Sequence, residues 1–222
     1  MIGIIFAMNE ELSKFLELVD LKKKNKIYDI DFYECSYKNK QLILVESGIG
    51  KVNAARGTQI LLDNYDIKYV FNIGVAGAVN ENIKILDIVV GNKLVQYDFD
   101  LIGFGYELGY VPKVGTYIET DSKLLSLAAN DDVHVGVIAS GDKFVTSKKI
   151  AKEVSDNFNA LCVEMEGASI AQVCYLSKVP FLVIRSISDS IVKSNNKMDY
   201  DEFLDISSEK VSKYLIDIIN KI

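Results

Sequence analysis

The segment 161–189, LCVEMEGASIAQVCYLSKVPFLVIRSISD, constrains the fold of this chain more than any other stretch. A short apolar run ends in two carboxylates, apolar residues at helical spacing follow over 167–177, and a Val-Pro pair then ends the predicted helix. The next run, 181–184, is continuously apolar, as in strands buried on both faces of a parallel sheet. Because ligands bind outside the carboxyl ends of such strands, this strand–helix–strand unit is expected to bring Glu166 and Asp189 to one edge of the sheet.

The rest of the 222-residue chain also alternates apolar runs with amphipathic segments, joined by short links. This alternation is typical of a sheet covered by helices on both faces, and the length suits one domain with a substantial core. We therefore predict an α/β fold, a single domain over 1–222 with a central mixed, mostly parallel twisted sheet flanked by helices. A helix is expected to follow Asn9, its predicted N-cap. Further strands are expected at 1–6, 27–37, 41–46, 69–73, 85–94 and 133–139, and further helices at 147–158 and 201–222.

The acidic balance of the chain limits its partners. The 31 Asp and Glu residues outnumber the 25 Lys and Arg residues, which gives a net charge of −6. Nucleic acids and anionic membranes bind basic surfaces, so we expect a small-molecule partner, no nucleic acid and no membrane. The N-terminus lacks the features of a signal peptide and no run approaches the roughly 20 apolar residues of a membrane span, so a cytoplasmic location is expected.

The reactive side chains point to carboxylate chemistry. Cys35, Cys162 and Cys174 lack the spacing of a zinc site or of a disulfide framework, and we expect no metal and no cofactor. His134 is the only histidine and lies in a predicted strand, where we expect it to be structural. Catalysis by a serine or cysteine with a histidine base could use only His134. Acid–base work must therefore fall to Asp and Glu.

Two glycine-containing segments follow predicted strands. The first, 47–53 (SGIGKVN), lacks the Ser or Thr that follows the lysine of a P-loop and the third glycine of a dinucleotide fingerprint. A tight strand-to-helix turn explains it at least as well as ligand contact. The second, 74–78 (GVAGA), would let the backbone approach a ligand closely, which makes Ala76 and Gly77 candidate binding residues.

The segment 97–112, YDFDLIGFGYELGYVP, combines aromatic residues and glycines without a regular period. It is too apolar for an ordinary solvated loop. We expect a partner subunit to cover it.

Seven segments, in this order, carry a resemblance to a known family: GIIFAMNEEL, ESGIGKVNAA, GVAGA, DFD with FGYELGYVP, SGDKFV, VEMEGASIA and IRSISD. The chain resembles the 5′-methylthioadenosine/S-adenosylhomocysteine nucleosidases of the nucleoside phosphorylase family nearly from end to end. The order of VEMEG and SISD is the most specific part of the match. The resemblance implies a nucleoside phosphorylase-like fold and a role in methionine salvage.

The implied activity is hydrolysis of the N-glycosidic bond of methylthioadenosine and S-adenosylhomocysteine, with 5′-deoxyadenosine as a further expected substrate, releasing adenine and the sugar. The reaction passes through an oxocarbenium-like sugar and needs a proton donor for the base and an activated water. By the resemblance, Asp189 delivers a proton to N7 of adenine, Glu11 deprotonates the water and Glu166 grips the ribose hydroxyls. The two roles require separated pKa values: we expect burial against Phe144 to raise the pKa of Asp189 and a helix N-terminus to favour ionised Glu11.

The resemblance assigns further residues to the substrate pocket. Met165 would pack on the sugar with Glu164 nearby, Phe144 would stack on the base, and the Val145 backbone would read the edge of the base. The remaining implied pocket residues are Ile49, Arg185 beside the water, Ser188 beside Asp189, the apolar Phe203, and Phe104 and Pro112 from the neighbouring subunit of a homodimer.

Two residues depart from the family pattern, and several reaction classes are alternatives to the nucleosidase. Tyr97 and Val75 stand where many relatives have histidine and serine. Phosphorylases of the family hold phosphate with arginines in the first loop and before the strand-end glycines, where this chain has AMNEEL and Asn72, so water is the expected nucleophile. The alternatives are a purine nucleoside phosphorylase, an aminodeoxyfutalosine hydrolase, and a non-catalytic nucleoside-binding protein.

Overall fold

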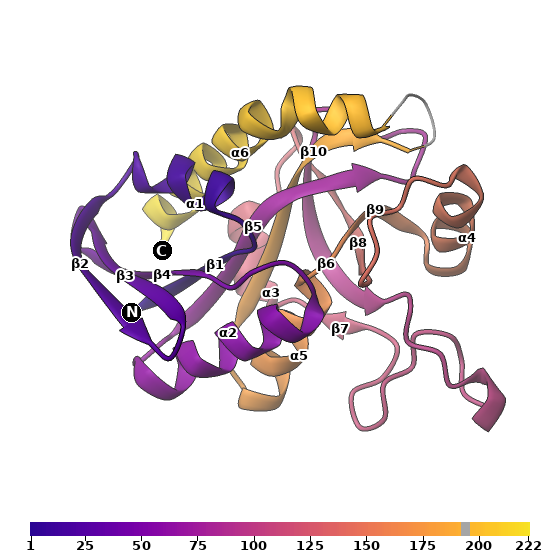
Figure 1. Ribbon diagram of the computed structural model, residues 1–222, viewed down its shortest axis with the longest axis horizontal. Helices are drawn as coiled ribbons and strands as arrows, with labels where there is room; N and C mark the ends of the chain where they lie inside the picture. The colour runs from indigo at the N-terminus through magenta and orange to yellow at the C-terminus, as the bar shows by residue number, and fades with distance from the viewer. Residues whose placement is uncertain (192–195) are drawn as a thin grey trace.

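The computed structural model describes residues 1–191 and 196–222, and it has the predicted α/β fold with a mixed sheet flanked by helices (Figure 1). The strands are β1 (Ile2–Phe6), β2 (Asp20–Ile27), β3 (Ile30–Tyr37), β4 (Lys40–Glu46), β5 (Tyr69–Ala78), β6 (Ile88–Gln96), β7 (Ile118–Glu119), β8 (His134–Ser140), β9 (Ala160–Glu164) and β10 (Phe181–Ser190). The helices are α1 (Asn9–Leu16), α2 (Lys51–Asn64), α3 (Ser122–Ala128), α4 (Lys148–Phe158), α5 (Gly167–Ser177) and α6 (Asn196–Lys221), with a 3-10 turn η1 (Ile102–Phe104). In the part of the chain described, no helix combines the length and the apolar character that crossing a bilayer requires.

Strand β5 is the centre of the sheet, because it pairs with β1, β9 and β10. The strand order is β10-β6-β8-β9-β5-β1-β4-β3-β2, and the additional pairing of β10 with β5 closes the first five of these strands into a ring. The pairings of β5 with β10 and of β8 with β6 and β9 are parallel, whereas β5–β9 and β10–β6 are antiparallel. The two strands of the predicted strand–helix–strand unit, β9 and β10, are not neighbours, because β5 lies between them.

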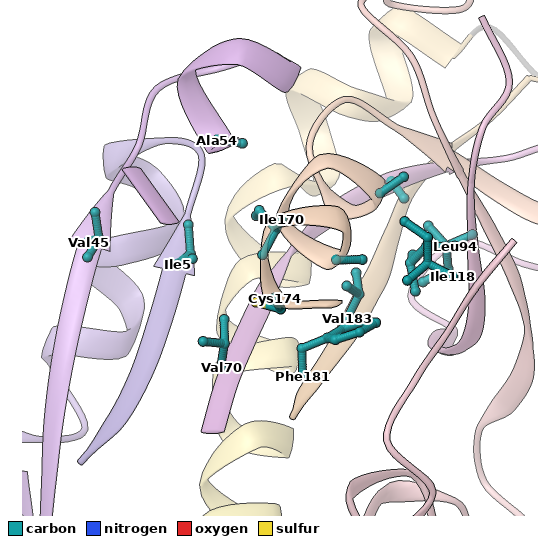
Figure 2. Close-up of a cluster of buried hydrophobic side chains, with 14 of the residues drawn as sticks. Ile5, Val45, Ala54, Val70, Leu94, Ile118, Ile170, Cys174, Phe181 and Val183 are labelled. Atoms are coloured by element: carbon teal, nitrogen blue, oxygen red, sulfur yellow. The ribbon is translucent and has the colours of Figure 1, made fainter. Parts of the chain in front are cut away.

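Two apolar clusters lie on opposite faces of the sheet. Val70 of β5 and Val183 of β10 belong to the cluster under α2 and α5, whereas the adjacent Phe71 and Leu182 belong to the cluster under α1, α3 and α6. Figure 2 shows the first cluster, with Ile170 and Cys174 of α5 beside the strands. Burial of each large apolar side chain contributes about 1.5–3 kcal/mol. The continuously apolar run 181–184 is thus explained, because β10 is covered on both faces, as predicted.

The predicted helices and strands differ from the observed ones where tertiary contacts decide the bounds of a segment. Strand β2 was not predicted, because its lysine-rich sequence lacks alternation; it is the edge strand, where lysines discourage pairing with other chains. The N-cap of α1 is Met8 and not Asn9. Helix α6 begins at Asn196 rather than at residue 201, and β10 continues to Ser190, beyond the apolar run.

Candidate active site

A cavity of about 590 Å³ lies where β1, β5, β9 and β10 end. It brings together most of the residues singled out from the sequence. Those that line it are Glu11, Ile49, Ala76, Gly77, Phe144, Glu164, Met165, Glu166, Ser188 and Asp189. Among its described lining residues there is no lysine, arginine or histidine.

Glu11, in the first turn of α1, is buried and held by three backbone amides. Its Oε2 accepts hydrogen bonds from the N–H groups of Ala7 (3.1 Å) and Met8 (3.3 Å), and its Oε1 accepts one from Val75 (3.0 Å). Burial raises the pKa of Glu11, although the guanidinium of Arg185 and the three N–H groups act in the opposite direction. The helix N-terminus was expected to favour the ionised form, but the cost of burying the charge is larger, so that this carboxyl keeps its proton to a higher pH than usual.

The glycines of β5 make room for the two predicted catalytic carboxylates. A Cβ on Gly74 would overlap the Glu11 carboxylate, and one on Gly77 would lie 2.9 Å from Oδ2 of Asp189. The sequence suggested that these glycines let a ligand approach the backbone. Their contacts instead show that they let acidic side chains lie against the strand.

Asp189 follows an irregularity in β10. The register of β10 against β5 shifts between Ile187 and Asp189, so that Ser188 has no paired residue and Asp189 lies opposite Gly77. Bulges of this kind re-aim side chains next to active sites. The Ser188 hydroxyl donates to Oδ1 of Asp189 at 2.8 Å, and Asp189 is almost completely buried.

Glu166 is the N-cap residue of α5 and reaches the glycine loop before α2. Its Oε1 accepts a hydrogen bond from the N–H of Gly50 at 2.8 Å. Burial and the neighbouring Glu164 raise the pKa of Glu166 to about 8, while the Gly50 amide and Arg185 oppose that rise. The loop thus contacts a site residue directly, in addition to making a tight turn.

Glu164 lines the cavity, but its carboxylate is already engaged. It accepts hydrogen bonds from the amides of Glu166 (3.1 Å) and Gly167 (2.7 Å) and from the Ser140 hydroxyl, and it forms a buried ion pair with Arg185. Breaking such a pair leaves an uncompensated buried charge, at a cost of about 3–5 kcal/mol. The geometry fits Glu164 for orienting the start of α5 rather than for contacting substrate.

Arg185 lies behind the cavity wall and is not one of its lining residues. Its guanidinium donates to Glu164, to the Asn72 side chain and to the Asn72 carbonyl oxygen at 3.3 Å. Burial disfavours its charge, but the carboxylates of Glu164, Glu166 and Glu11 more than compensate and raise the pKa of Arg185. The arginine therefore supplies a fixed positive charge beside three acids.

The loop after β8 forms another wall of the larger cavity. Phe144 is half exposed in the cavity, and its ring meets that of Tyr200 edge-on, with the centroids 5.6 Å apart. A second cavity of about 40 Å³ adjoins the first, shares Phe144 and Asp189 with it, and is lined by Val145. The smaller cavity thus places Val145 and Asp189 together.

Besides Arg185, three predicted residues lie outside both cavities. Phe203 of α6 lines neither of them, and the aromatic residue of α6 that does is Tyr200, whose hydroxyl contacts Sδ of Met8 at 3.5 Å. Tyr200 was not predicted, although an aromatic residue three positions before Phe203 could have indicated a second pocket residue in this helix. Phe104, with 82% of its surface exposed, and Pro112 also line neither cavity of this single chain.

The two departures from the family pattern have different surroundings. Val75 uses its backbone, not its side chain, to hold Glu11. Tyr97 packs against Gly141, and its buried hydroxyl has no hydrogen-bond partner in the described part of the chain. Burial and the nearby Asp98 raise the pKa of Tyr97 to about 12, so that it stays neutral. Among residues 1–191 and 196–222, no group of three or more His, Cys, Asp or Glu side chains could hold a metal ion.

Comparisons with known proteins show the family of the chain. The family model of the phosphorylase superfamily matches residues 1–220. A 5′-methylthioadenosine/S-adenosylhomocysteine nucleosidase of Exiguobacterium is 37% identical, with 100% of this chain and 98% of the relative covered. An aminodeoxyfutalosine nucleosidase of Campylobacter jejuni is also 37% identical, over 95% of this chain and 94% of the relative.

Solved structures show the same family relationship. The Helicobacter pylori nucleosidase with butyl-thio-DADMe-Immucillin-A has a TM-score of 0.94 at 38% identity, covering 100% of this chain and 98% of that one. The Neisseria meningitidis nucleosidase with methylthio-immucillin-A has a TM-score of 0.94 at 32% identity, covering 100% and 99%. The chain therefore belongs to the phosphorylase superfamily, in the branch that contains the methylthioadenosine/S-adenosylhomocysteine and aminodeoxyfutalosine nucleosidases.

Proposed function

We propose that this protein hydrolyses the N-glycosidic bond of 5′-methylthioadenosine and S-adenosylhomocysteine, and that residues 1–222 act as one nucleosidase domain. The observation that carries the proposal is the convergence of Glu11, Glu166 and Asp189, from three separate elements, on one cavity. A protein that only binds nucleosides has no need of three buried carboxylates with separate environments. 5′-Deoxyadenosine is a further expected substrate.

In the proposed reaction, Asp189 donates a proton to N7 of adenine as the bond between C1′ and the base breaks. The Ser188 hydroxyl, which bonds Oδ1, and the bulge at Ser188 aim this carboxyl toward the base pocket beside Phe144 and Val145. Protonation of N7 makes adenine a better leaving group, because the electron pair of the broken bond then enters a positively charged ring and adenine departs as a neutral molecule. General acid catalysis of this kind contributes about 10²–10⁴-fold.

Glu11 would take a proton from the water that attacks C1′, so that the water oxygen bonds to the sugar and its proton passes to the carboxylate. The three amide donors fix the Glu11 side chain, and the raised pKa makes it a stronger base than an exposed carboxylate. Glu166 would accept hydrogen bonds from the ribose hydroxyls while the Gly50 amide holds it. Met165 and Tyr200 supply apolar surface around the sugar.

Water rather than phosphate is the proposed nucleophile. The described lining of the larger cavity contains acids and no basic side chain, and Arg185 lies behind the cavity wall, where it donates to Glu164 and Asn72. A phosphate dianion would be repelled there. An assay of adenine release from methylthioadenosine tests this: the rate should be independent of phosphate and the sugar product should be free methylthioribose. A ribose 1-phosphate detected by mass spectrometry would replace the hydrolase reading with that of a phosphorylase.

Aminodeoxyfutalosine is the second candidate substrate, because relatives named aminodeoxyfutalosine nucleosidase are as similar in sequence as the first group. The residues that act on adenine and ribose do not distinguish the two. The comparison of kcat/KM for methylthioadenosine, S-adenosylhomocysteine and aminodeoxyfutalosine, with inosine as a control for base recognition, ranks them.

We also propose a homodimer in which Phe104 and Pro112 of the neighbouring subunit complete the pocket. The loop between β6 and β7 exposes the apolar side chains of Ile102, Phe104 and Tyr106, of which Phe104 is the most exposed at 82%. Apolar surface of this kind marks an interaction site. The proposed cytoplasmic location rests on the features of the sequence, and the proposed role in methionine salvage rests on the family resemblance.

A further inference from the structure

The N-terminus of α2 is capped by a carboxylate from a distant part of the chain. Its N-cap residue is Gly50, which has no side chain to accept the free amides of the first turn. Asp142, in the loop after β8, accepts the N–H of Lys51 at 2.8 Å instead. A carboxylate at this end of a helix is also favoured by the helix dipole. The start of α2 is therefore fixed by the loop that carries Phe144.

The Lys51 side chain closes a cycle with the same loop. Its Nζ donates to Oδ1 of Asp98 at 2.5 Å and to Oε1 of Gln96 at 3.1 Å, and Oδ2 of Asp98 accepts the N–H of Asp142 at 2.9 Å. The Lys51 and Asp98 side chains are 16% and 30% exposed, so this pair is better shielded from water than an ordinary surface pair. Three segments meet in the cycle: the glycine loop, the end of β6 and the loop after β8.

This cycle adjoins the ribose end of the cavity through two bonds. The amide of Gly50, one residue before Lys51, donates to Oε1 of Glu166. Gln96 also donates to Oε1 of Gln172 at 2.6 Å, and Gln172 belongs to α5, the helix that Glu166 begins. Gly50 has φ +97, and a Cβ there would lie 3.1 Å from Oδ1 of Asp142. The backbone geometry at Gly50 is thus tied to both the cycle and Glu166.

We propose that Lys51, Asp98 and Asp142 are positioning residues, which hold the Gly50 amide on Glu166 and fix the loop that carries Phe144. They touch neither cavity and act through Gly50. The inference rests on the proposed function, since it assigns a task at the ribose end of the same site.

The charges around Glu166 indicate what loss of the cycle would do. Glu164 of β9 and Glu11 of α1 disfavour its ionisation, Arg185 of β10 and the Gly50 amide favour it, and Asp189 lines the same cavity. With the amide displaced, the pKa of Glu166 rises further above about 8. More of the protein then carries a neutral Glu166 at a given pH, which accepts hydrogen bonds from ribose hydroxyls less well. The effect falls on substrate binding and on its pH dependence more than on kcat.

The experiment compares Lys51→Met with Arg56→Met. Arg56 is also in α2, but it pairs with Asp29 at an exposed site away from the cavity, which makes it the matched control. Because a hydrogen bond to a charged group is being displaced, Lys51→Met should raise KM for methylthioadenosine about tenfold at pH 7, with kcat within about twofold of the wild type. The acid limb of kcat/KM should move to higher pH. Lys51→Arg should restore most of the loss, and Arg56→Met should change neither quantity.

Asp98→Asn is the second variant, because it keeps the size of the side chain and an acceptor for the Asp142 amide. It tests the same inference if Lys51→Met does not fold. It should shift KM and the acid limb in the same direction, by about threefold in KM. Unchanged KM and pH profile in a folded variant, or an equal change in Arg56→Met, would overturn the inference. A wild-type protein that releases no adenine would instead overturn the proposed function.

Discussion

Gly77 lies opposite Asp189 in the pairing of β5 with β10, and a methyl group on Gly77 would come within 2.9 Å of the Asp189 carboxylate. The same glycine is paired with Val163 of β9, two residues before Met165. Strand β5 therefore fixes the positions of β9 and β10 on the two sides of the cavity. Its glycines decide how closely the acidic side chains approach the strand.

Gly77→Ala should disable catalysis without unfolding the protein. The added methyl group must displace Asp189, and a misplacement of about 1 Å can cost about 10²-fold in rate. Gly136→Ala in β8 is the control, because its Cβ would crowd the apolar Leu161 side chain, 2.5 Å away, and touch no acid of the cavity. Both variants should lose stability, by about 1–3 kcal/mol for an overpacked site. Only Gly77→Ala should lose kcat; equal kcat in the two variants would contradict the relationship.

Asp189→Asn and Glu11→Gln should separate the acid from the base. Each should lower kcat by about 10²–10⁴-fold, because each removes one proton-transfer group. Binding of a substrate analogue should be nearly normal in Glu11→Gln, where the change faces the water, and weaker in Asp189→Asn, where it faces adenine. Steady-state kinetics and calorimetry measure the two effects, and near-wild-type kcat in either variant would mean that the role is assigned to the wrong residue.

Glu166 should make the protein less stable as pH rises. Its pKa is about 8 in the folded protein against 4.5 for an ordinary glutamate, so the folded state binds the proton more tightly than the unfolded state does. Its stabilising contribution is fully present below pH 4.5 and is lost as pH rises through about 8. The Tm of Glu166→Gln minus the Tm of the wild type should therefore increase from pH 5 to pH 9. A difference that stays flat across this window would show that Glu166 titrates normally.

Phe104→Ala should weaken substrate binding although Phe104 is remote from the cavity of its own chain. If the neighbouring subunit supplies it, KM for methylthioadenosine should rise about tenfold, which corresponds to a loss of about 1.4 kcal/mol of binding free energy. Tyr28→Ala removes an equally exposed aromatic ring, 79% exposed in the β2–β3 turn, and should leave KM unchanged. A sedimentation profile of a fully active monomer would remove the argument for a shared pocket.

Local pattern was sufficient for the elements whose apolar residues repeat at one period. Helix α5 has the predicted bounds, and β3 and β4 match the strands predicted at 27–37 and 41–46 within a few positions, because spacing and stop residues decide such segments. The resemblance carried by GIIFAMNEEL, VEMEG and SISD also selected Glu11, Glu166 and Asp189, which line the cavity. These choices required only residue types and their order.

Tertiary contacts decided the rest. Strand β2 pairs with β3, and α6, which begins at Asn196, places Tyr200 and not Phe203 in the cavity lining. Glu166 and Asp189 meet through β5, which stands between their strands. The sequence alone determined which acids are present and which segments carry them. Only the folded structure decided the pKa of Glu11, because its burial outweighs the helix terminus that favours ionisation, and burial is a property of packing between distant segments.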